Sequence, residues 1–453
     1  MRQATAQRAD QPGIVAGPGP HTFIDLFAGC GGLSLGLMQA GWIGLFAVER
    51  SPDAFKTLRH NLVDDNACRP FNGRFAWPDW LPVEPVEIGD FLSRHRDELS
   101  ALRGTVTLVA GGPPCQGFSF AGRRQANDPR NQLFRKHLDL VDMLRPEVVF
   151  LENVQGISVA HGRKQWLEGG RRGRPRRSYA EKIKQLLDEH GYEPQQMLVR
   201  ACDFGVPQFR PRYLTVGIRR DLFAGRQAPN FFDTLKAIRN DFLQARGLPT
   251  DHLVNVAQAI SDLRVVGKTL VACNDPESPG GFRQISYVGP ESDYQRFMHG
   301  SLNGHPVNSL RLANHQPSTV EKFQRILATC RKGVQLSDAD RERLGIKKSA
   351  IVPLAPDQPS HTLTTLPDDL LHYSEPRIHT VREHARLQSF PDWFDFRGKY
   401  TTGGNRRTRE CPRYTQVGNA VPPLLAEAVG QAIRKLLADL RLASFIARVA
   451  KGG

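Results

Sequence analysis

Two reactive side chains follow apolar runs in this sequence of 453 residues. Cys115 lies in "LVAGGPPCQGFSF", where a glycine pair and a proline pair precede a single thiol. A buried structural cysteine needs no such frame, whereas a thiol that meets a flat substrate at a fixed angle can use one. Glu152 ends the run "EVVFLE" and is followed by Asn153 and Val154. If both runs are strands of one sheet, the thiol and the carboxyl group can face one ligand, as nucleophilic catalysis requires.

The segment "PQFRPR" adds three polar side chains at alternate positions, Gln208, Arg210 and Arg212. Alternate residues of an extended segment share a face. All three side chains could therefore point at one anionic or polar substrate.

A glycine-rich turn, "FAGCGG", covers Phe27 to Gly32 and indicates a cofactor site. Glycines let the backbone approach a ligand closely, and the helix that follows favours a negative group at its N-terminus. Ser34 stands where G-x-G-x-x-G has its third glycine, so the turn alone leaves a plain tight turn open. Glu49, twenty residues after Gly29, can accept both ribose hydroxyls of an adenosine-type cofactor. Asp90, in "EIGDF", is either an acceptor for an adenine amino group or a turn aspartate.

Strands that alternate with helices must position these groups. The apolar runs predict strands, Ser51 and Pro52 predict the start of one helix, and Ser178 with Glu181 predicts a capping box at another. The expected strands are "HTFIDLF", "IGLFAVE", "TVTLVA", "EVVFLE" and "RYLTVGI". The alternation predicts a doubly wound, mostly parallel α/β sheet, whose ligands bind at the carboxyl ends of the strands.

The chain is predicted to divide into two domains. Residues 1–20 indicate a flexible tail, and residues 21–219 together with 412–445 form the cofactor-binding domain. Residues 220–400 form a second, smaller and irregular domain, because Gly, Pro, Asn, Ser and His are frequent there and periodicity is weak. An amphipathic helix after "GNAVPP" is expected to pack back on the first domain.

The charge balance favours a polyanionic partner. Lys and Arg number 61 against 46 Asp and Glu, a net charge of +15, which is typical of nucleic-acid binding, although a merely basic surface stays open. The seven cysteines are scattered without a CxxC pair, so we expect reduced thiols, a cytoplasmic setting and no metal. No run approaches the ~20 apolar residues of a membrane span.

The ordered set of motifs resembles the DNA (cytosine-5) methyltransferase family of bacterial restriction-modification type. The set is "DLFAGCGG", "VERS", "IGDF", "GGPPCQGFSFAGRR", "ENVQGI", "PQFRPRYLTVGI", "TVREHARLQSFPDWF" and "GNAVPP", spanning about Phe23 to Val429. The resemblance implies a Rossmann-like lobe that binds S-adenosyl-L-methionine and a second lobe, the target-recognition domain, that reads duplex DNA.

The family's roles carry over to matching residues of this chain. The implied cofactor-binding residues are Phe27, Gly29, Gly31, Glu49, Asp90, Pro113 and Asn419. The implied catalytic residues are Cys115, Glu152, Arg210 and Arg212. The implied DNA-binding residues are Ser119, Arg123, Arg124, Arg130 and Gln208, most of them in a loop that follows the nucleophile. Some relatives have an aromatic residue after the ribose acid, where this chain has Arg50.

The implied reaction explains the frame around the thiol. Addition of Cys115 at C6 of cytosine makes the ring enamine-like, so that C5 attacks the methyl sulfonium, while Glu152 neutralises charge on N3. Such an attack cannot occur inside a stacked duplex, so the base must flip out. No dedicated side chain is evident for removal of the C5 proton, and water could serve.

Three other functions remain to be weighed. An RNA (tRNA) cytosine-5 methyltransferase could share this core, a catalytically inactive DNA-binding protein would not need Cys115 and Glu152, and a nicotinamide-dependent dehydrogenase would leave the "PPCQ" and "ENV" segments unexplained. We expect a monomer, and a partner restriction endonuclease that acts at the same site is possible.

Overall fold

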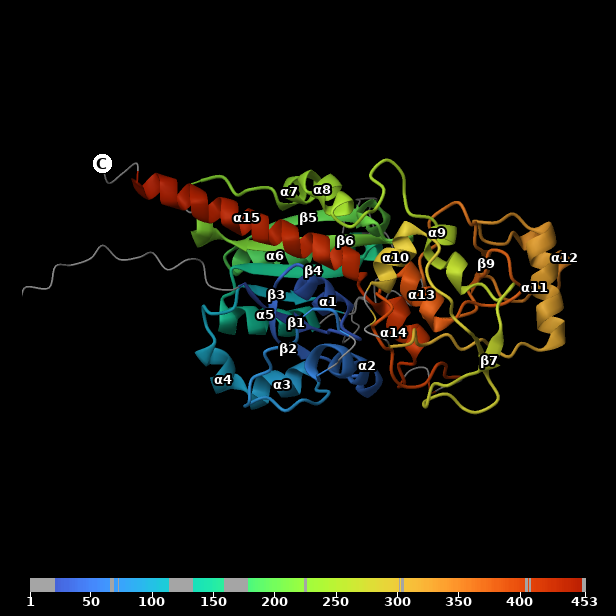
Figure 1. Cartoon of the computed structure of the whole chain (residues 1–453). Coiled ribbons are helices and arrows are strands. Elements are labelled where there is room, and N and C mark those ends of the chain that lie inside the picture. Colours follow the sequence, from blue (N-terminus) through green and yellow to red (C-terminus); the bar gives the residue numbers. More distant parts are fainter. Residues whose placement is uncertain are drawn as a thin grey trace, which may run out of the picture.

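A six-stranded sheet forms the centre of the computed structural model (Figure 1). The structure describes residues 21–65, 69–71, 73–113, 133–158, 178–223, 226–300, 302, 305–403, 406 and 409–449. The strands are β1 (Thr22–Leu26), β2 (Ile43–Val48), β3 (Leu108–Gly111), β4 (Val148–Val154), β5 (Tyr192–Arg200) and β6 (Pro211–Arg219). They lie in the order β2-β1-β3-β4-β6-β5, and β6 runs antiparallel to both of its neighbours. The predicted doubly wound, mostly parallel sheet is confirmed.

Helices cover both faces of the sheet because neighbouring residues of each strand point to opposite faces. In β1, Phe23 packs with α1 (Gly32–Gln39) and α15 (Pro423–Val449), whereas Ile24 packs on the other face. That other face is covered by α3 (Ile88–Arg94), α4 (Arg96–Ala101), α5 (Leu133–Leu144) and α6 (Tyr179–Glu189). The long helix α15 therefore returns to the sheet, as expected from its amphipathic sequence.

The predicted helix starts are present. The Ser51 side chain accepts from the backbone N–H of Ala54 at the start of α2 (Pro52–Leu58), which continues into a π-helical turn, Arg59–Val63. Ser178 and Glu181 form the capping box of α6. Both caps satisfy backbone N–H groups that have no partner within the helix.

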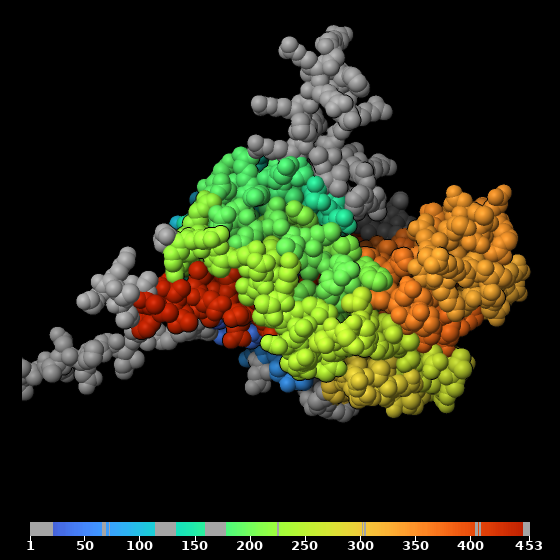
Figure 2. Space-filling model, turned by 90° about the horizontal axis from the view of Figure 1, so that it is seen from above, coloured from blue at the N-terminus to red at the C-terminus, as the bar shows by residue number. Residues whose placement is uncertain are grey.

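The part of the chain beyond β6 is built from shorter elements. Helices α7 (Phe231–Ala237) and α8 (Arg239–Gln244) lie beside α15 (Figure 1). The remaining elements are α9 (Val256–Ile260), α10 (Asp293–His299), α11 (Pro317–Thr329), α12 (Asp338–Arg343), α13 (Val381–Leu387), α14 (Arg413–Asn419) and the short strands β7 (Leu270–Ala272), β8 (Arg283–Ile285), β9 (Val352–Pro353) and β10 (Leu370–Leu371). In Figure 2 the orange segment, which includes α11 and α12, projects on the side away from the red helix α15. Because α7 and α8 contact the sheet's own helix, a domain boundary at residue 220 remains a prediction.

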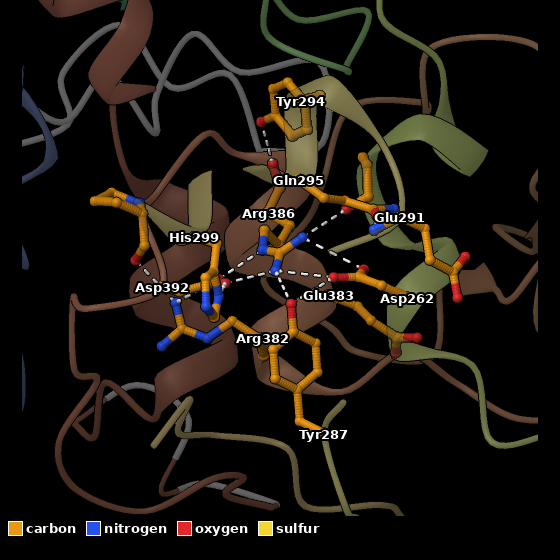
Figure 3. Close-up of polar contacts among 12 residues, drawn as sticks. Asp262, Tyr287, Glu291, Tyr294, Gln295, His299, Arg382, Glu383, Arg386 and Asp392 are labelled. Atoms are coloured by element: carbon orange, nitrogen blue, oxygen red, sulfur yellow. Dashed lines mark hydrogen bonds and ion pairs between the residues drawn. The ribbon is translucent and has the colours of Figure 1, made fainter. Parts of the chain in front are cut away.

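A buried arginine holds the elements around α13 together (Figure 3). The Arg386 side chain is fully buried and donates from Nε and Nη2 to the two carboxylate oxygens of Asp392, each at 2.5 Å. It also donates to Asp262 at 3.2 Å and to the Tyr287 hydroxyl at 3.3 Å. We call Arg386, Asp392, Asp262 and Tyr287 the Arg386 cluster. Burying these charges is tolerable only because each is paired and hydrogen-bonded.

Among the described residues, no helix is both long and apolar enough to cross a membrane.

Candidate active site

The strand register brings the predicted chemical groups to one edge of the sheet. Four neighbouring residues form a row across the parallel strands: Val48, Leu26, Gly111 and Leu151. The next residue along each strand is Glu49, Phe27, Gly112 or Glu152. Since the carboxyl ends of parallel strands share an edge, the glycine-rich turn, the segment that leads to Cys115 and the acid Glu152 lie next to one another.

Glu49 is already bound to the glycine-rich turn. Its Oε2 accepts the backbone N–H of Gly29 at 2.9 Å, and its Oε1 accepts that of Ser51 at 2.7 Å. Burial raises the pKa of the Glu49 carboxyl, and the N–H groups of Ser51 and Gly29 oppose that rise. Each carboxylate oxygen keeps a further lone pair, so the group can still accept ribose hydroxyls.

The turn itself has a left-handed backbone, with φ of 60° at Phe27, 57° at Gly29 and 95° at Gly31. Glycine adopts these angles without strain, whereas Phe27 does not, and such strain concentrates at functional sites. Asp90 lies exposed in the first turn of α3, and the bond from Val86 N–H to the Glu49 carbonyl at 2.9 Å brings the approach to that helix beside Glu49.

Glycine is required at the end of β3. A Cβ at Gly111 would lie 2.6 Å from the Leu26 carbonyl oxygen, closer than real Cβ contacts allow. Gly112 lies against Glu152, since a Cβ there would be 3.6 Å from the acid's Oε2. Pro113 follows and is buried. The segment that leads to Cys115 therefore begins beside Glu152. Cys115 itself, with Ser119, Arg123, Arg124 and Arg130, falls outside the described residues, as does the tail 1–20.

Arg212 faces Glu152 from the neighbouring strand. The register pairs Arg212 of β6 with Val154 of β4, and Arg212 Nε lies 2.5 Å from Glu152 Oε1. The two side chains are 8% and 12% exposed, so the pair is largely but not fully removed from solvent. Arg212 Nη1 donates to the Pro211 carbonyl at 2.8 Å, which fixes the guanidinium beside the acid.

Gln208 and Arg210 form hydrogen bonds with distant segments of the protein. They share a face with Arg212, as alternation predicts, but the segment 360–363 lies over them: Phe209 N–H donates to the Ser360 carbonyl, and Gln208 Oε1 accepts the Leu363 N–H at 2.9 Å. Gln208 is fully buried, and its predicted contact with DNA stays a prediction. The covering segment is about 150 positions away in sequence, beyond what the local pattern could reveal.

The Arg210 guanidinium also donates hydrogen bonds to backbone carbonyls of the protein. Its Nη2 donates to the carbonyls of Gly418 at 2.9 Å and Ala420 at 3.0 Å, on either side of Asn419. A Cβ at Gly32 would lie 2.4 Å from the Val421 carbonyl, so this segment packs against the start of α1. Arg210 thus holds the exposed Asn419 near the glycine-rich turn, and its predicted catalytic role stays a prediction.

One buried acid near this edge, Asp25, was not predicted from the sequence. Asp25 of β1 is fully buried, and the Ser34 hydroxyl donates to its Oδ2 at 2.5 Å. Burial raises the pKa of Asp25 to about 7, with the Ser34 hydrogen bond opposing it. Two features of the sequence could have indicated this pair: an aspartate interrupts the apolar run "TFIDLF", and a serine stands in place of the third glycine of the loop.

In the ranges that the structure describes, no three His, Cys, Asp or Glu side chains are grouped so that they could hold a metal ion.

Comparison with known proteins finds matches along most of the chain. The family model of C-5 cytosine-specific DNA methylases matches residues 21–435. The type II methyltransferase M.DdeI of Desulfomicrobium norvegicum is 29% identical over 434 residues, which cover 92% of this chain and 90% of that protein. The type II methyltransferase M1.HphI of Haemophilus parahaemolyticus is 28% identical over 421 residues, 92% of this chain and 87% of that protein.

A solved structure shares the fold. It is described as a DNA modification methyltransferase encoded within a prophage of E. coli, and it aligns with a TM-score of 0.58 at 23% identity. The alignment covers 92% of this chain and 99% of that one.

Proposed function

The chain belongs to the C-5 cytosine-specific DNA methylase family, and we propose that its strand-end edge transfers a methyl group from S-adenosyl-L-methionine to C5 of a flipped-out cytosine in duplex DNA. The observation that carries this assignment is the Glu152–Arg212 pair beside Gly112, because it provides an acid and a cation at the point where the chain leads to Cys115. The family makes an RNA substrate the weaker alternative.

Each residue of this edge has its own role in the proposed reaction. The Cys115 thiolate adds to C6, and the electron pair of the C5–C6 double bond shifts toward N3 and C5. Glu152 shares a proton with N3 and so neutralises the charge that develops there. Arg212, fixed beside Glu152, donates to the base O2. After methyl transfer, loss of the C5 proton to water allows the thiolate to leave.

The glycine-rich turn suits the methyl donor. When bound, S-adenosyl-L-methionine supplies an electrophilic methyl group on its sulfonium. Glu49 would hold the ribose hydroxyls, since its carboxylate sits at a strand end with lone pairs to spare. Asp90 would accept the adenine amino group. The remaining proposed contacts are Phe27, Gly29, Gly31, Pro113 and Asn419.

DNA binding involves the loop after the nucleophile and the part of the chain beyond β6. Ser119, Arg123, Arg124 and Arg130 are proposed to contact phosphates, and residues 220–400 to read the sequence. Relatives such as M.DdeI are named type II methyltransferases, so we further propose a restriction-modification role with a partner endonuclease. A monomer in the bacterial cytoplasm fits that role.

Bisulfite sequencing of DNA from cells that express the protein tests this function. We expect protected cytosines in one recurring sequence, and none in cells that express Cys115→Ser. Methylation of tRNA but not of duplex DNA by the purified protein would contradict it.

A further inference from the structure

Helix α2 presents a polar face to the chain around α14. Asp53, Thr57 and Asn61 recur every four residues and therefore lie on one side of the helix and of its π-helical extension. The Thr57 hydroxyl donates to Gln416 Oε1 at 2.6 Å, while Asp53 and Asn61 bond to backbone groups of the segment 395–416 at 2.8 to 2.9 Å. Figure 1 shows α2 and α14 side by side where the sheet meets the part beyond β6.

A carboxylate from a third segment completes this junction. Glu277 lies in the loop between β7 and β8 and accepts from Lys56 Nζ of α2. It also accepts the Gly398 N–H at 2.8 Å and Arg413 Nη2 at 3.0 Å. One side chain thus joins the β7–β8 loop, α2 and α14.

The surroundings of Arg413 add further bonds between this loop and α14. Asp275, from the same loop, binds the Arg413 guanidinium and accepts the Tyr400 hydroxyl at 2.7 Å. The Arg413 side chain is 1% exposed, and its guanidinium carbon lies 4.3 Å from the centre of the Tyr400 ring. Arg413 and Asp275 therefore anchor the loop to α14 by hydrogen bonds within the protein.

The same helix begins at the proposed ribose site. Ser51, which caps α2, donates its N–H to Glu49 Oε1 at 2.7 Å. Lys56 lies on that short helix, so a continuous set of contacts runs from Glu49 through Ser51 and α2 to Glu277.

We propose that Glu277 is a positioning residue that, through Lys56 and Arg413, couples cofactor binding at Glu49 to DNA binding by the part of the chain beyond β6. The inference rests on the proposed cofactor and DNA sites. Such a coupling is reciprocal, so S-adenosyl-L-homocysteine strengthens DNA binding by the factor by which DNA strengthens binding of that compound.

The test measures this factor directly. The probe is a short duplex containing the cytosine that bisulfite sequencing identifies, and its Kd is measured with and without saturating S-adenosyl-L-homocysteine. We expect the compound to tighten DNA binding at least about fivefold in the wild-type protein. In Lys56→Met and Glu277→Gln the factor falls to about one, whereas affinity for the compound without DNA stays within about twofold. Lys56→Arg keeps the charge and retains the factor.

Lys435→Met is the matched control. Lys435 is 53% exposed against 56% for Lys56, but its partner Asp439 lies on the same helix, α15. The control should keep the wild-type factor. The proposal is overturned if wild-type protein shows no coupling, if Lys56→Met retains it, or if Lys435→Met loses it equally. Lys56 is at the surface, so its variant remains informative if Glu277→Gln fails to fold. A wild-type protein that methylates DNA without coupling refutes this inference alone, whereas one that does not methylate DNA refutes the proposed function.

Discussion

The Arg386 cluster and the Glu152–Arg212 pair use the same two groups, a guanidinium and a carboxylate, in opposite ways. Arg386 is fully buried and has acceptors at Nε, Nη1 and Nη2, from Asp392, Asp262, the Ala259 carbonyl and the Tyr287 hydroxyl. Glu152 is 12% exposed and, within the described residues, pairs with a single cation, Arg212.

The two regions therefore differ in role: the Arg386 cluster stabilises the fold, and the Glu152–Arg212 pair is available to a ligand. A cluster in which each group is saturated has nothing left to offer a ligand and stabilises one packing of the elements around α13. A pair at the open edge of the sheet keeps carboxylate and guanidinium hydrogen-bonding capacity for a base. We therefore expect changes in the cluster to alter stability, and changes in the pair to alter rate.

Replacement of Arg386 by methionine should have the largest effect. It leaves Asp262 as a buried carboxylate without its cation and Asp392 with only the more distant Arg382, at 3.8 Å, and we expect a loss of roughly 3–5 kcal/mol in the free energy of unfolding. Urea denaturation measures it. Arg296→Met is the control, because Arg296 is 56% exposed and pairs with Asp293 on the surface, where a loss of less than about 1 kcal/mol is expected. Equal effects in both variants would remove the distinction between the two regions.

Glu152→Gln should show the reverse pattern. The amide keeps the shape but cannot share a proton with N3 in the same way, so single-turnover methyl transfer should slow on the order of 100-fold. The free energy of unfolding and the Kd for duplex DNA should change little. A rate near that of the wild-type protein would show that the pair at the sheet edge is structural after all.

Glu49→Ala tests the cofactor end of the same edge. Loss of the carboxylate that accepts from Gly29 and Ser51 should weaken S-adenosyl-L-methionine binding by roughly 1.5–3 kcal/mol. Isothermal titration calorimetry gives this value, and DNA affinity without cofactor serves as the internal control. Unchanged cofactor affinity would exclude Glu49 from the site.

Acid should lower the stability of both regions, because each buries neutral histidines, His137 in α5 and others beyond β6. Burial lowers the pKa of His379 and of His384 to about 3. Each is neutral in both states above its unfolded value of about 6.5, so its contribution to stability is complete there and is lost as the pH falls below that value. Replacing His384 by leucine should flatten the dependence of unfolding free energy on pH between about 6.5 and 5 by about 1 kcal/mol per unit. Parallel curves for the two proteins would mean that His384 is protonated in the folded state.

Sequence reasoning succeeded where a local pattern decides the structure. The apolar runs gave β1 to β4 and β6, and the residues Ser51, Pro52, Ser178 and Glu181 gave two helix starts. It missed β5, an edge strand in which several polar side chains are only partly buried, so that no apolar run marks it.

Contacts between distant segments were not predictable in this way. Arg386 bonds to Asp262, which lies 124 residues away in sequence, and Arg210 bonds to the Leu363 carbonyl, which lies 153 residues away. No periodicity encodes such pairs, so the sequence pattern could not show that Arg210 and Gln208 also bond to distant segments of the protein. The edge that holds Glu49, Gly112 and Glu152 was predictable, because the carboxyl ends of parallel strands meet by topology alone.

Covalent trapping tests the central claim, that this edge presents Cys115 to C6 of a cytosine. The substrate is a duplex with 5-fluorocytosine at the target position, incubated with the protein and S-adenosyl-L-methionine. After methyl transfer the C5 substituent must leave as a cation, which a proton can do and fluorine cannot, so the sulfur remains bonded to C6. We predict a denaturation-resistant adduct whose modified peptide maps to Cys115, and no adduct with Cys115→Ser, because a serine hydroxyl is far less nucleophilic. An adduct at another cysteine, or one that persists in Cys115→Ser, would contradict the account.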